Sequence, residues 1–299
     1  IYVIMDTFII RFVEVWMEIY TVDAFTDVPL GGNPAGVAIF ARDLPGEEAM
    51  RAAAAEMGYS ETAFILKLAD GAFRIRFFTP VEEVPLCGHA TVGAFSLLLK
   101  KGIVAEGKSY IARTGAGDIE VSVQDDIVWL DMAKPRELFA LGGEDTRALL
   151  SMFSLPEDAC GALAPAAVDA GLPDIMLPLK NRELLSSLAP DFEAVARLSE
   201  RLGVTGVHVY APGESAAGYC RNFAPLYGIP EEAATGTSNG ALTYYLFQRG
   251  MIKPGETNLF IQGEAMGKPS EIYTRLALDT QGLPKIRVGG RAVVREGTS

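Results

Sequence analysis

Apolar positions along this chain follow two periods, which predict helices and strands in a mixed order. Apolar residues recur at helical spacing over 47–57 and 191–202. Two nearly uninterrupted apolar runs, 89–101 and 238–249, each stop at a glycine, as helices often do. These patterns predict four helices.

Shorter stretches of alternating or continuous apolar residues predict strands between these helices. The expected strands are 19–25, 36–40, 62–68, 72–78, a strand around Tyr110, 119–123, 127–131, 207–210, 218–223, 259–262, 271–277 and 285–294. The run Gly31-Gly32-Asn33-Pro34 predicts a turn between the first two strands, and Asp70-Gly71 predicts a hairpin turn.

An internal repeat is the strongest signal in the sequence. Residues 87–107 (CGHATVGAFSLLLKKGIVAEG) align without gaps to residues 235–255 (TGTSNGALTYYLFQRGMIKPG), with Gly88 on Gly236. Upstream, RFFTP at 76–80 resembles RNFAP at 221–225. Because strand, proline loop, glycine turn, helix and glycine stop recur in one order, we interpret the chain as two matching halves.

Composition and charge narrow the possible functions. The chain has 299 residues, of which 49% are apolar and 21% charged, as in a soluble globular protein. The formal net charge of -12 argues against nucleic acid and anionic membranes as partners. An acidic small molecule stays possible, because the local field of a pocket can oppose the net charge.

The few cysteines and histidines set the expected compartment and cofactors. Cys87, Cys160 and Cys220 contain no CxxC pair, which favours a reduced, cytoplasmic chain. A metal cluster based on histidine would need nearly all of the histidines, of which there are only His89 and His208. We therefore expect no metal, and no strand is followed by a dinucleotide-binding GxGxxG motif.

Residues 1–16 are apolar but contain Asp6, Arg11 and Glu14. They lack the features of a signal peptide and are too short and too charged to span a bilayer. We expect a natural start at Met17 and a non-native or added extension before it. The alternative is a genuine additional edge strand.

The two glycine turns open helices, and helix starts attract anions. Free backbone N–H groups and about half a positive charge gather at a helix N-terminus. Gly88 and Gly236 let a ligand approach the backbone closely, so we expect a carboxylate to bind there. Each glycine could equally serve only a tight turn.

Residues that transfer protons stand near these turns. His89 follows Gly88, and the pair Glu231-Glu232 precedes Gly236. Glu61 lies just before a strongly apolar strand, where a carboxylate is costly unless it is used or paired. The structural alternative for His89 is a histidine that only caps the helix. The structural alternative for Glu61 is an exposed charge in a loop.

Cys87 is a second candidate base, because a helix N-terminus lowers the pKa of a thiol. Alternatively, Cys87 serves only as a small apolar residue in the core. In the repeat Cys87 falls on Thr235, which is a poor base. The sequence therefore disfavours a symmetric racemase with two thiols.

Several long motifs in order resemble the phenazine-biosynthesis PhzF-like proteins, which share the diaminopimelate epimerase fold. The motifs are DAFTDVPLGGNPAGV (23–37), GYSETAF (58–64), PVEEVPLCGHATVGA (80–94), RNFAPLYGIPEEAATGTSNGAL (221–242), QGEAMGKPSEI (262–272) and VGGRAV (288–293). The resemblance implies an α+β fold of two pseudo-symmetric lobes. Each lobe is a mostly antiparallel, barrel-like sheet around a central helix, with the site in the cleft between lobes.

The expected lobes are 17–130, to which 284–299 return, and 131–283. The resemblance further implies an isomerase without a cofactor, acting on a small carboxylated metabolite, and a homodimer.

The resemblance assigns roles to individual residues. Glu61 is expected to shuttle a proton between substrate carbons, with His89 and Glu232 as the other catalytic residues. Substrate binding is expected at Gly88, Gly236, Thr237 and Asn33.

Two departures from the family pattern bear on the substrate. Glu232 stands where the family has Asp, and Ala233 replaces the Pro that follows. Proton transfer is sensitive to placement, so a different carboxylated substrate is favoured over the phenazine precursor. Thr237 in place of Ser keeps the hydroxyl group.

Two alternatives stay open. One is a racemase or dehydratase of the same fold with Cys87 as its single thiol base. The other is a non-catalytic protein that binds small acids.

Overall fold

The computed structural model describes residues 2–4, 7–12 and 15–295, with side chains from Met17 onward. The chain forms two compact units, unit 1 with residues 1–131 and 289–299, and unit 2 with residues 132–288. Among the described residues, every helix is too short or too polar to cross a bilayer.

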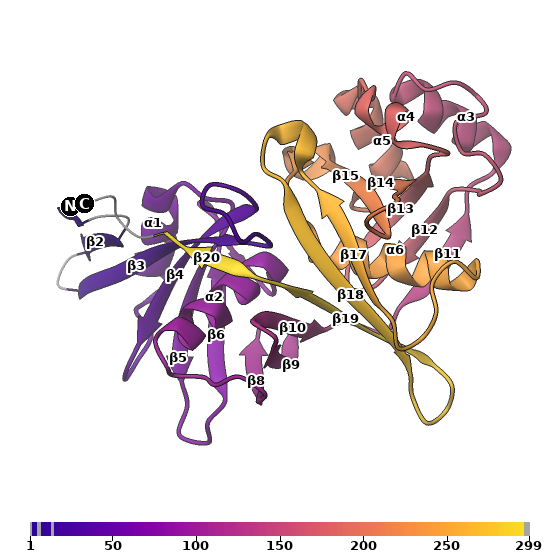
Figure 1. Ribbon diagram of the computed structural model, residues 1–299. Helices are drawn as coiled ribbons and strands as arrows, with labels where there is room; N and C mark the ends of the chain where they lie inside the picture. Colours follow the sequence, from indigo (N-terminus) through magenta and orange to yellow (C-terminus); the bar gives the residue numbers. More distant parts are fainter. Residues whose placement is uncertain (1, 5–6, 13–14, 296–299) are drawn as a thin grey trace. The chain divides into compact units, whose positions relative to one another are not determined.

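Unit 1 contains two helices and a sheet drawn in indigo to magenta in Figure 1, together with the yellow strand β20. Its elements are β1 (Tyr2–Ile4), β2 (Thr7–Phe12), β3 (Val15–Ala24), β4 (Asn33–Phe40), α1 (Glu47–Met57), β5 (Thr62–Lys67), β6 (Phe73–Phe78), β7 (Glu83–Val84), α2 (Gly88–Lys100), β8 (Ser109–Thr114), β9 (Gly117–Gln124), β10 (Ile127–Asp131) and β20 (Ala292–Val294).

Unit 2 contains the remaining elements, and β19 begins in it. They are β11 (Arg136–Ala140), α3 (Gly143–Met152), β12 (Ala166–Asp169), β13 (Pro173–Pro178), α4 (Arg182–Ser186), α5 (Phe192–Leu202), β14 (Gly206–Pro212), β15 (Gly218–Ala224), η1 (Pro225–Tyr227), β16 (Ile229–Glu232), α6 (Gly236–Gln248), β17 (Thr257–Gln262), η2 (Glu264–Met266), β18 (Ser270–Leu278) and β19 (Pro284–Gly290).

The strand ladders of the two units follow one pattern of directions. In unit 1, β3 pairs antiparallel with both β20 and β4, and β4 pairs parallel with β5. Further along the ladder, β5 pairs antiparallel with β6, β6 pairs parallel with β8, and β8 pairs antiparallel with β9. In unit 2, β11, β12, β13, β14, β15, β17 and β18 pair in the same succession of directions. The sequence repeat is therefore also a repeat of topology.

The two apolar helices occupy corresponding places. α2 and α6 have 13 residues each, and both their starts and their ends fall on positions matched by the repeat. Within unit 1, α2 packs against β3, β4, β5, β10 and β20; within unit 2, α6 packs against β11, β12, β13 and β18. A helix surrounded by strands must be apolar nearly all round, which explains the long apolar runs.

Each unit also has a core outside its central helix. In unit 1, Met17, Phe64 and Phe78 pack with Met50 and other residues of α1. In unit 2, Phe153 and Phe223 lie in a larger cluster under α3 and α5. Most of the apolar periodicity of the sequence is thus accounted for by burial.

Two parts of the sequence prediction need correction. β4 begins at Asn33, so the predicted turn stops one residue before Asn33-Pro34. Residues 132–190, for which the pattern predicts no element, contain β11, α3, β12, β13 and α4. These elements are short and interrupted by prolines, and α3 buries only Leu149 and Leu150, so their periodicity is weak.

The N-terminal segment forms strands where it is described. β2 pairs antiparallel with β3, and β1 pairs with β2. Whether residues 1–16 are native stays a prediction, and residues 1, 5–6 and 13–14 lie outside the described part of the chain.

Candidate active site

In unit 1, two parallel strands and the start of α2 bring four predicted site residues together. Asn33 begins β4, and Glu61 immediately precedes β5. These strand starts are adjacent because β4 and β5 are parallel, with Gly36 opposite Thr62 and the Gly36 amide bonded to the Glu61 carbonyl at 3.2 Å. Gly88 and His89 form the first turn of α2.

His89 is the centre of this cluster. Its Nδ1 lies 3.3 Å from Asn33 Nδ2, and its Nε2 lies 3.3 Å from Glu61 Oε2 and 3.5 Å from Ser60 Oγ. When the Asn33 amide donates to Nδ1, the ring proton resides on Nε2 and faces Glu61. Burial lowers the pKa of His89, against the opposing effect of the Glu61 charge, so the ring is neutral at pH 7.

Glu61 combines partial exposure with an unsatisfied oxygen. Its side chain is 18% exposed. Oε2 itself is buried and accepts no hydrogen bond from the described residues, since the contact with His89 falls outside hydrogen-bond geometry. A buried carboxylate oxygen without a hydrogen bond is costly and indicates a functional group or an absent ligand.

Cys87 completes the cluster from the N-cap position of α2. Its Sγ lies 3.4 Å from Nδ1 and 3.8 Å from Nε2 of His89, so it sits against the ring face. Sγ, a His89 ring nitrogen and a Glu61 oxygen all lie within 4.8 Å of one another. From the sequence, Cys87 is expected only as an alternative base.

The start of α2 is open to a ligand. No side chain caps the helix at its N-cap, Cys87. A Cβ built on Gly88 would meet no atom within 4 Å. The helix start therefore presents backbone N–H groups beside an uncrowded glycine, which suits an anion.

In unit 2, Glu232 is held at the start of α6. Thr235 Oγ1 donates to Glu232 Oε2 at 2.5 Å, and Gln262 Nε2 donates to the Glu232 carbonyl at 2.8 Å and to Thr235 Oγ1 at 3.1 Å. Asn239 Nδ2 donates to Gln262 Oε1 at 2.9 Å. Gly236 and Thr237, in the first turn of α6, are partly exposed beside this network.

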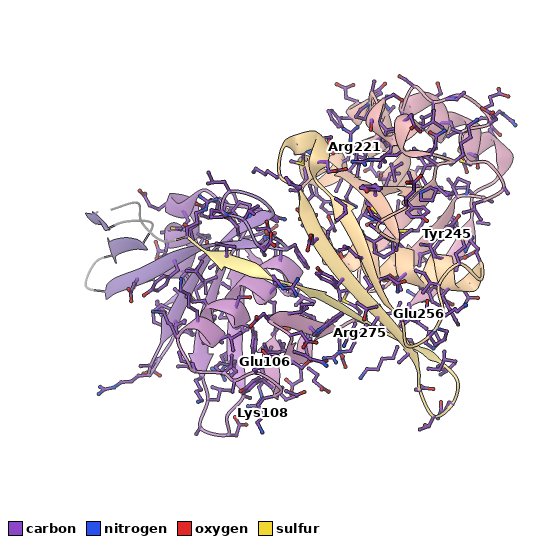
Figure 2. The ribbon with its side chains drawn as sticks, viewed as in Figure 1. Glu106, Lys108, Arg221, Tyr245, Glu256 and Arg275 are labelled. Atoms are coloured by element: carbon purple, nitrogen blue, oxygen red, sulfur yellow. The ribbon has the colours of Figure 1, made fainter. Side chains whose placement is uncertain are left out.

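Glu231 has a structural partner instead. Arg221, labelled in Figure 2, donates from Nε and Nη2 to the two carboxylate oxygens of Glu231, each at 2.8 Å. Both side chains are largely buried. A bidentate pair of this kind fixes β16 against β15 and leaves Glu232 as the carboxylate beside the helix start.

Unit 2 contains a further polar network that the sequence did not predict. Ser238 Oγ donates to Asp174 Oδ2, and Asn222 Nδ2 lies 3.1 Å from Ser238 Oγ and 3.2 Å from His208 Nδ1. All four residues are buried. Burial raises the pKa of Asp174 to about 6 and lowers the pKa of His208 to about 3. Polar residues inside apolar strands, as in VHVY at 207–210, were the available signal.

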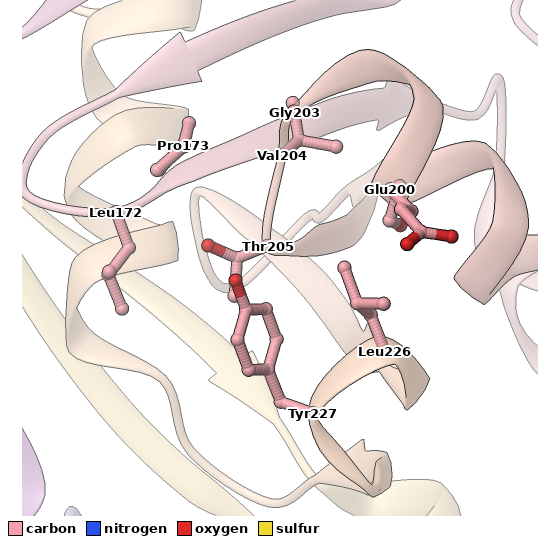
Figure 3. A pocket seen from close by; sticks show the side chains of 9 residues that line it. Leu172, Pro173, Glu200, Gly203, Val204, Thr205, Leu226 and Tyr227 are labelled. Carbon is pink, nitrogen blue, oxygen red and sulfur yellow. The ribbon is translucent and has the colours of Figure 1, made fainter.

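The pocket in Figure 3 lies in unit 2. It has a volume of about 360 Å³ and lies between the loop before β13, the end of α5 and η1. Its lining includes Leu172, Thr205 and Tyr227 but none of the predicted site residues.

Comparison with known proteins places this chain in a family. The family model described as phenazine biosynthesis-like protein matches residues 22–297. A Deinococcus radiodurans protein named as an isomerase is 38% identical over 288 residues, which cover 92% of each chain. A trans-2,3-dihydro-3-hydroxyanthranilate isomerase of Pseudomonas fluorescens is 31% identical and covers 91% of this chain and 95% of its own.

A solved structure supports the same fold. The crystal structure of a Bacillus anthracis phenazine biosynthesis protein of the PhzF family matches with a TM-score of 0.84 and 24% identity, over 94% of this chain and 97% of that one. The mixed α+β fold expected from the sequence is thereby confirmed. The chain belongs to the phenazine biosynthesis-like family and is an isomerase.

Proposed function

We propose that this protein is a cofactor-independent isomerase that moves a proton between carbons of a small carboxylated metabolite, with Glu61 as general acid and base. The observation that carries the proposal is the Glu61–His89 contact. It pairs a carboxylate oxygen that lacks a hydrogen bond with a neutral imidazole. The names of the relatives support an isomerase but leave the substrate open.

The reaction requires no external reagent. Glu61 Oε2 takes a proton from one carbon, and the electron pair of that C–H bond moves into the adjoining unsaturated system. Glu61 then returns a proton to another carbon, so one C–H bond breaks and one forms. A positioned general base of this kind contributes about 10²- to 10⁴-fold to the rate.

The remaining predicted residues take supporting roles in this proposal. His89 orients the substrate and Glu61, and Glu232 contributes a second ordered carboxylate. The helix starts at Gly88 and at Gly236, the latter with Thr237 as hydroxyl donor, each suit a negatively charged group of the substrate, because helix starts stabilise a carboxylate or the negative charge of an enolate. Because the Asn33 amide contacts His89, we assign Asn33 a part in orienting the imidazole besides substrate binding.

One alternative retains support from the structure. Cys87 touches His89, so a thiol base acting alone is geometrically possible. Replacing Cys87 with Ala separates the two mechanisms, because the Glu61 mechanism tolerates the loss of the thiol. A non-catalytic binding protein would bind small acids but show no solvent exchange at any bound carbon, even in the unaltered chain.

The test is uptake of solvent deuterium into a substrate. The first probe is trans-2,3-dihydro-3-hydroxyanthranilate, the substrate named for a relative, followed by other small unsaturated and amino acids in D₂O. Mass spectrometry would follow the label. We expect Glu61→Gln to lose at least about 100-fold in rate, because the amide cannot accept the proton.

The matched control is Glu56→Gln, an exposed glutamate of α1. It removes the same charge from the same unit and should leave the rate unchanged. Undiminished deuterium uptake by Glu61→Gln would refute the assignment.

A further inference from the structure

A buried glutamine at the end of β17 binds the segment that carries Glu232. Gln262 is fully buried, and its Nε2 donates to the Glu232 carbonyl at 2.8 Å and to Thr235 Oγ1 at 3.1 Å. Its Oε1 accepts from the Thr235 backbone N–H at 3.3 Å and from Asn239 Nδ2 at 2.9 Å. We propose that Gln262 and Thr235 are positioning residues, which form a hydrogen-bond relay that donates onto the Glu232 carboxylate and holds it for the reaction. Only the part that Glu232 takes in the reaction rests on the proposed function.

The direction of the relay follows from backbone groups that can bond in one sense only. The Thr235 N–H can only donate and the Glu232 carbonyl can only accept, so the Gln262 amide turns its oxygen to the first and its nitrogen to the second. Gln262 Nε2 must then donate to Thr235 Oγ1. The hydroxyl proton of Thr235 is thereby left for Glu232 Oε2, which lies 2.5 Å away.

The last bond of the relay is of the strong kind. A hydroxyl that donates to a charged carboxylate forms a bond of about 2.5–2.7 Å, roughly twice as strong as a bond between neutral groups. The distance from Thr235 Oγ1 to Glu232 Oε2 matches this range. Donation from a fixed hydroxyl stabilises the negative charge of Glu232 and restricts the rotation of its side chain, so the carboxylate has a set orientation.

Gly263 allows the end of β17 to come this close to the segment. Its φ is +81°, and a Cβ on it would lie 2.6 Å from the carbonyl oxygen of Ala233, the residue after Glu232. On the other side of Glu232, Glu231 is tied to Arg221 by two hydrogen bonds of 2.8 Å. The backbone around Glu232 is therefore fixed independently, and the relay acts on a side chain whose base does not move.

Unit 1 uses the corresponding positions differently. The repeat places Thr114, at the end of β8, on Gln262, and it places Cys87 on Thr235. Thr114 Oγ1 donates to the Gly117 carbonyl at 2.9 Å, within its own turn. The same strand end and helix start thus form with a local turn bond at this position, so the fold itself does not demand the relay. Its presence in unit 2 points to a task at the carboxylate.

The first test changes the hydroxyl alone. Thr235→Val keeps the branched shape and removes the donor, whereas Thr235→Ser keeps the hydroxyl. Turnover is followed by deuterium uptake, with trans-2,3-dihydro-3-hydroxyanthranilate as the first probe. We expect Thr235→Val to lower kcat about 10- to 100-fold with a much smaller change in KM, because a misplaced group slows the chemical step. Thr235→Ser should retain most of the rate.

Gln262→Met tests the other member of the relay. Methionine fills a similar space but lacks the donor that sets the direction of the Thr235 hydroxyl. We therefore expect a loss of kcat in the same range as for Thr235→Val. A rate equal to that of the unaltered chain would remove Gln262 from the relay.

Thr243→Val is the matched control. Thr243 is buried in α6, and its hydroxyl donates to the Asn239 carbonyl at 2.8 Å. Its replacement also removes a hydroxyl bond from this helix but should leave kcat unchanged. Circular dichroism of each variant checks that it folds. The relay is refuted if Thr235→Ser is as slow as Thr235→Val, or if the two valine variants lose the same rate.

A double-mutant cycle shows whether Thr235 acts through Glu232. If it does, adding Thr235→Val to Glu232→Ala should cause no further loss of kcat. In urea unfolding, the loss of unfolding free energy caused by Thr235→Val should likewise shrink once Glu232 is alanine. Equal effects of Thr235→Val with and without the Glu232 carboxylate would overturn the proposal.

These results are separable from the fate of the proposed function. The unfolding cycle needs no substrate, so it decides on the relay even if no probe takes up deuterium. Full rate in Thr235→Val beside a loss in Glu61→Gln would remove the relay and leave the isomerase mechanism. A loss in Thr235→Val beside full rate in Glu61→Gln would keep the relay and remove Glu61 as the base.

Discussion

At the scale of single residues, the two units use buried polar groups in different ways. In unit 1, His89 and its neighbours surround a carboxylate that is still partly exposed. In unit 2, Asp174, Ser238, Asn222 and His208 form a network that is closed from solvent. Such groups are costly to bury, and their effect appears in how stability depends on pH.

Asp174 provides the pH prediction. Its pKa is raised in the folded chain, from 3.8 to about 6, chiefly by burial. Between pH 3.8 and about pH 6, Asp174 binds more protons in the folded state than in the unfolded state. The contribution of Asp174 to the free energy of unfolding is therefore lost as pH rises. The change amounts to about 2 kcal/mol between pH 4 and pH 7.

Asp174→Asn removes this titration, and the free energy of unfolding can be measured in urea across that pH range. The free energy of unfolding of the variant, relative to that of the unaltered chain, should increase as pH rises. The comparison must be a difference, because His208, whose folded pKa is lowered to about 3, contributes the opposite slope. Parallel stability curves for the two proteins would contradict the prediction.

At the scale of elements, the parallel pair β4–β5 decides where Glu61 lies. Gly36 stands opposite Thr62, and a Cβ on Gly36 would come 2.6 Å from Thr62 Oγ1. The backbone of β4 can approach β5 this closely only without a side chain. The position of Glu61, next to Thr62, depends on that approach.

We therefore predict that Gly36→Ala destabilises the fold by about 1–3 kcal/mol and displaces Glu61. Thermal unfolding measures the first effect and deuterium uptake the second. Gly143→Ala, at the first position of α3, serves as control because its Cβ would meet only a flexible arginine end at 3.6 Å. Equal melting temperatures for the two variants would count against the close-packing argument.

At the scale of the whole molecule, the end of the chain completes unit 1. β20 pairs antiparallel with β3. Arg295 then donates from Nε and Nη2 to both oxygens of Asp23, at 2.9 and 2.7 Å. Asp23 is buried and also accepts from the Leu30 amide, and Arg295 is the cation paired with it.

Arg295→Ala should cost about 3 kcal/mol of unfolding free energy, because it leaves a buried carboxylate without its cation. Urea unfolding of the full chain measures this cost. Arg295→Lys keeps the charge but not the two-point contact, and should fall in between. As a control, Arg113→Ala breaks the exposed ion pair with Asp70 and should barely change the free energy of unfolding. A loss of stability as large as that of Arg295→Ala would argue against burial as the cause.

Much of the element order was predictable because its signals are local. The long apolar helices and the glycines that end them follow from the periodicity of neighbouring residues. The boundaries of α1 agree with the predicted 47–57, and α2 and α6 keep the spacing of the repeat. The elements between 132 and 190 were not predictable in this way, because their burial depends on distant strands rather than on their own pattern.

The sequence by itself determined the repeat, the helices and the family motifs, since each is written in adjacent residues. Only the tertiary structure decided which side chains meet. Asn33 and Glu61 are distant in the sequence from Cys87 and His89, and strand pairing joins the four into one cluster. Pairing over such separations depends on the packing of the whole unit, which no local pattern of residues contains.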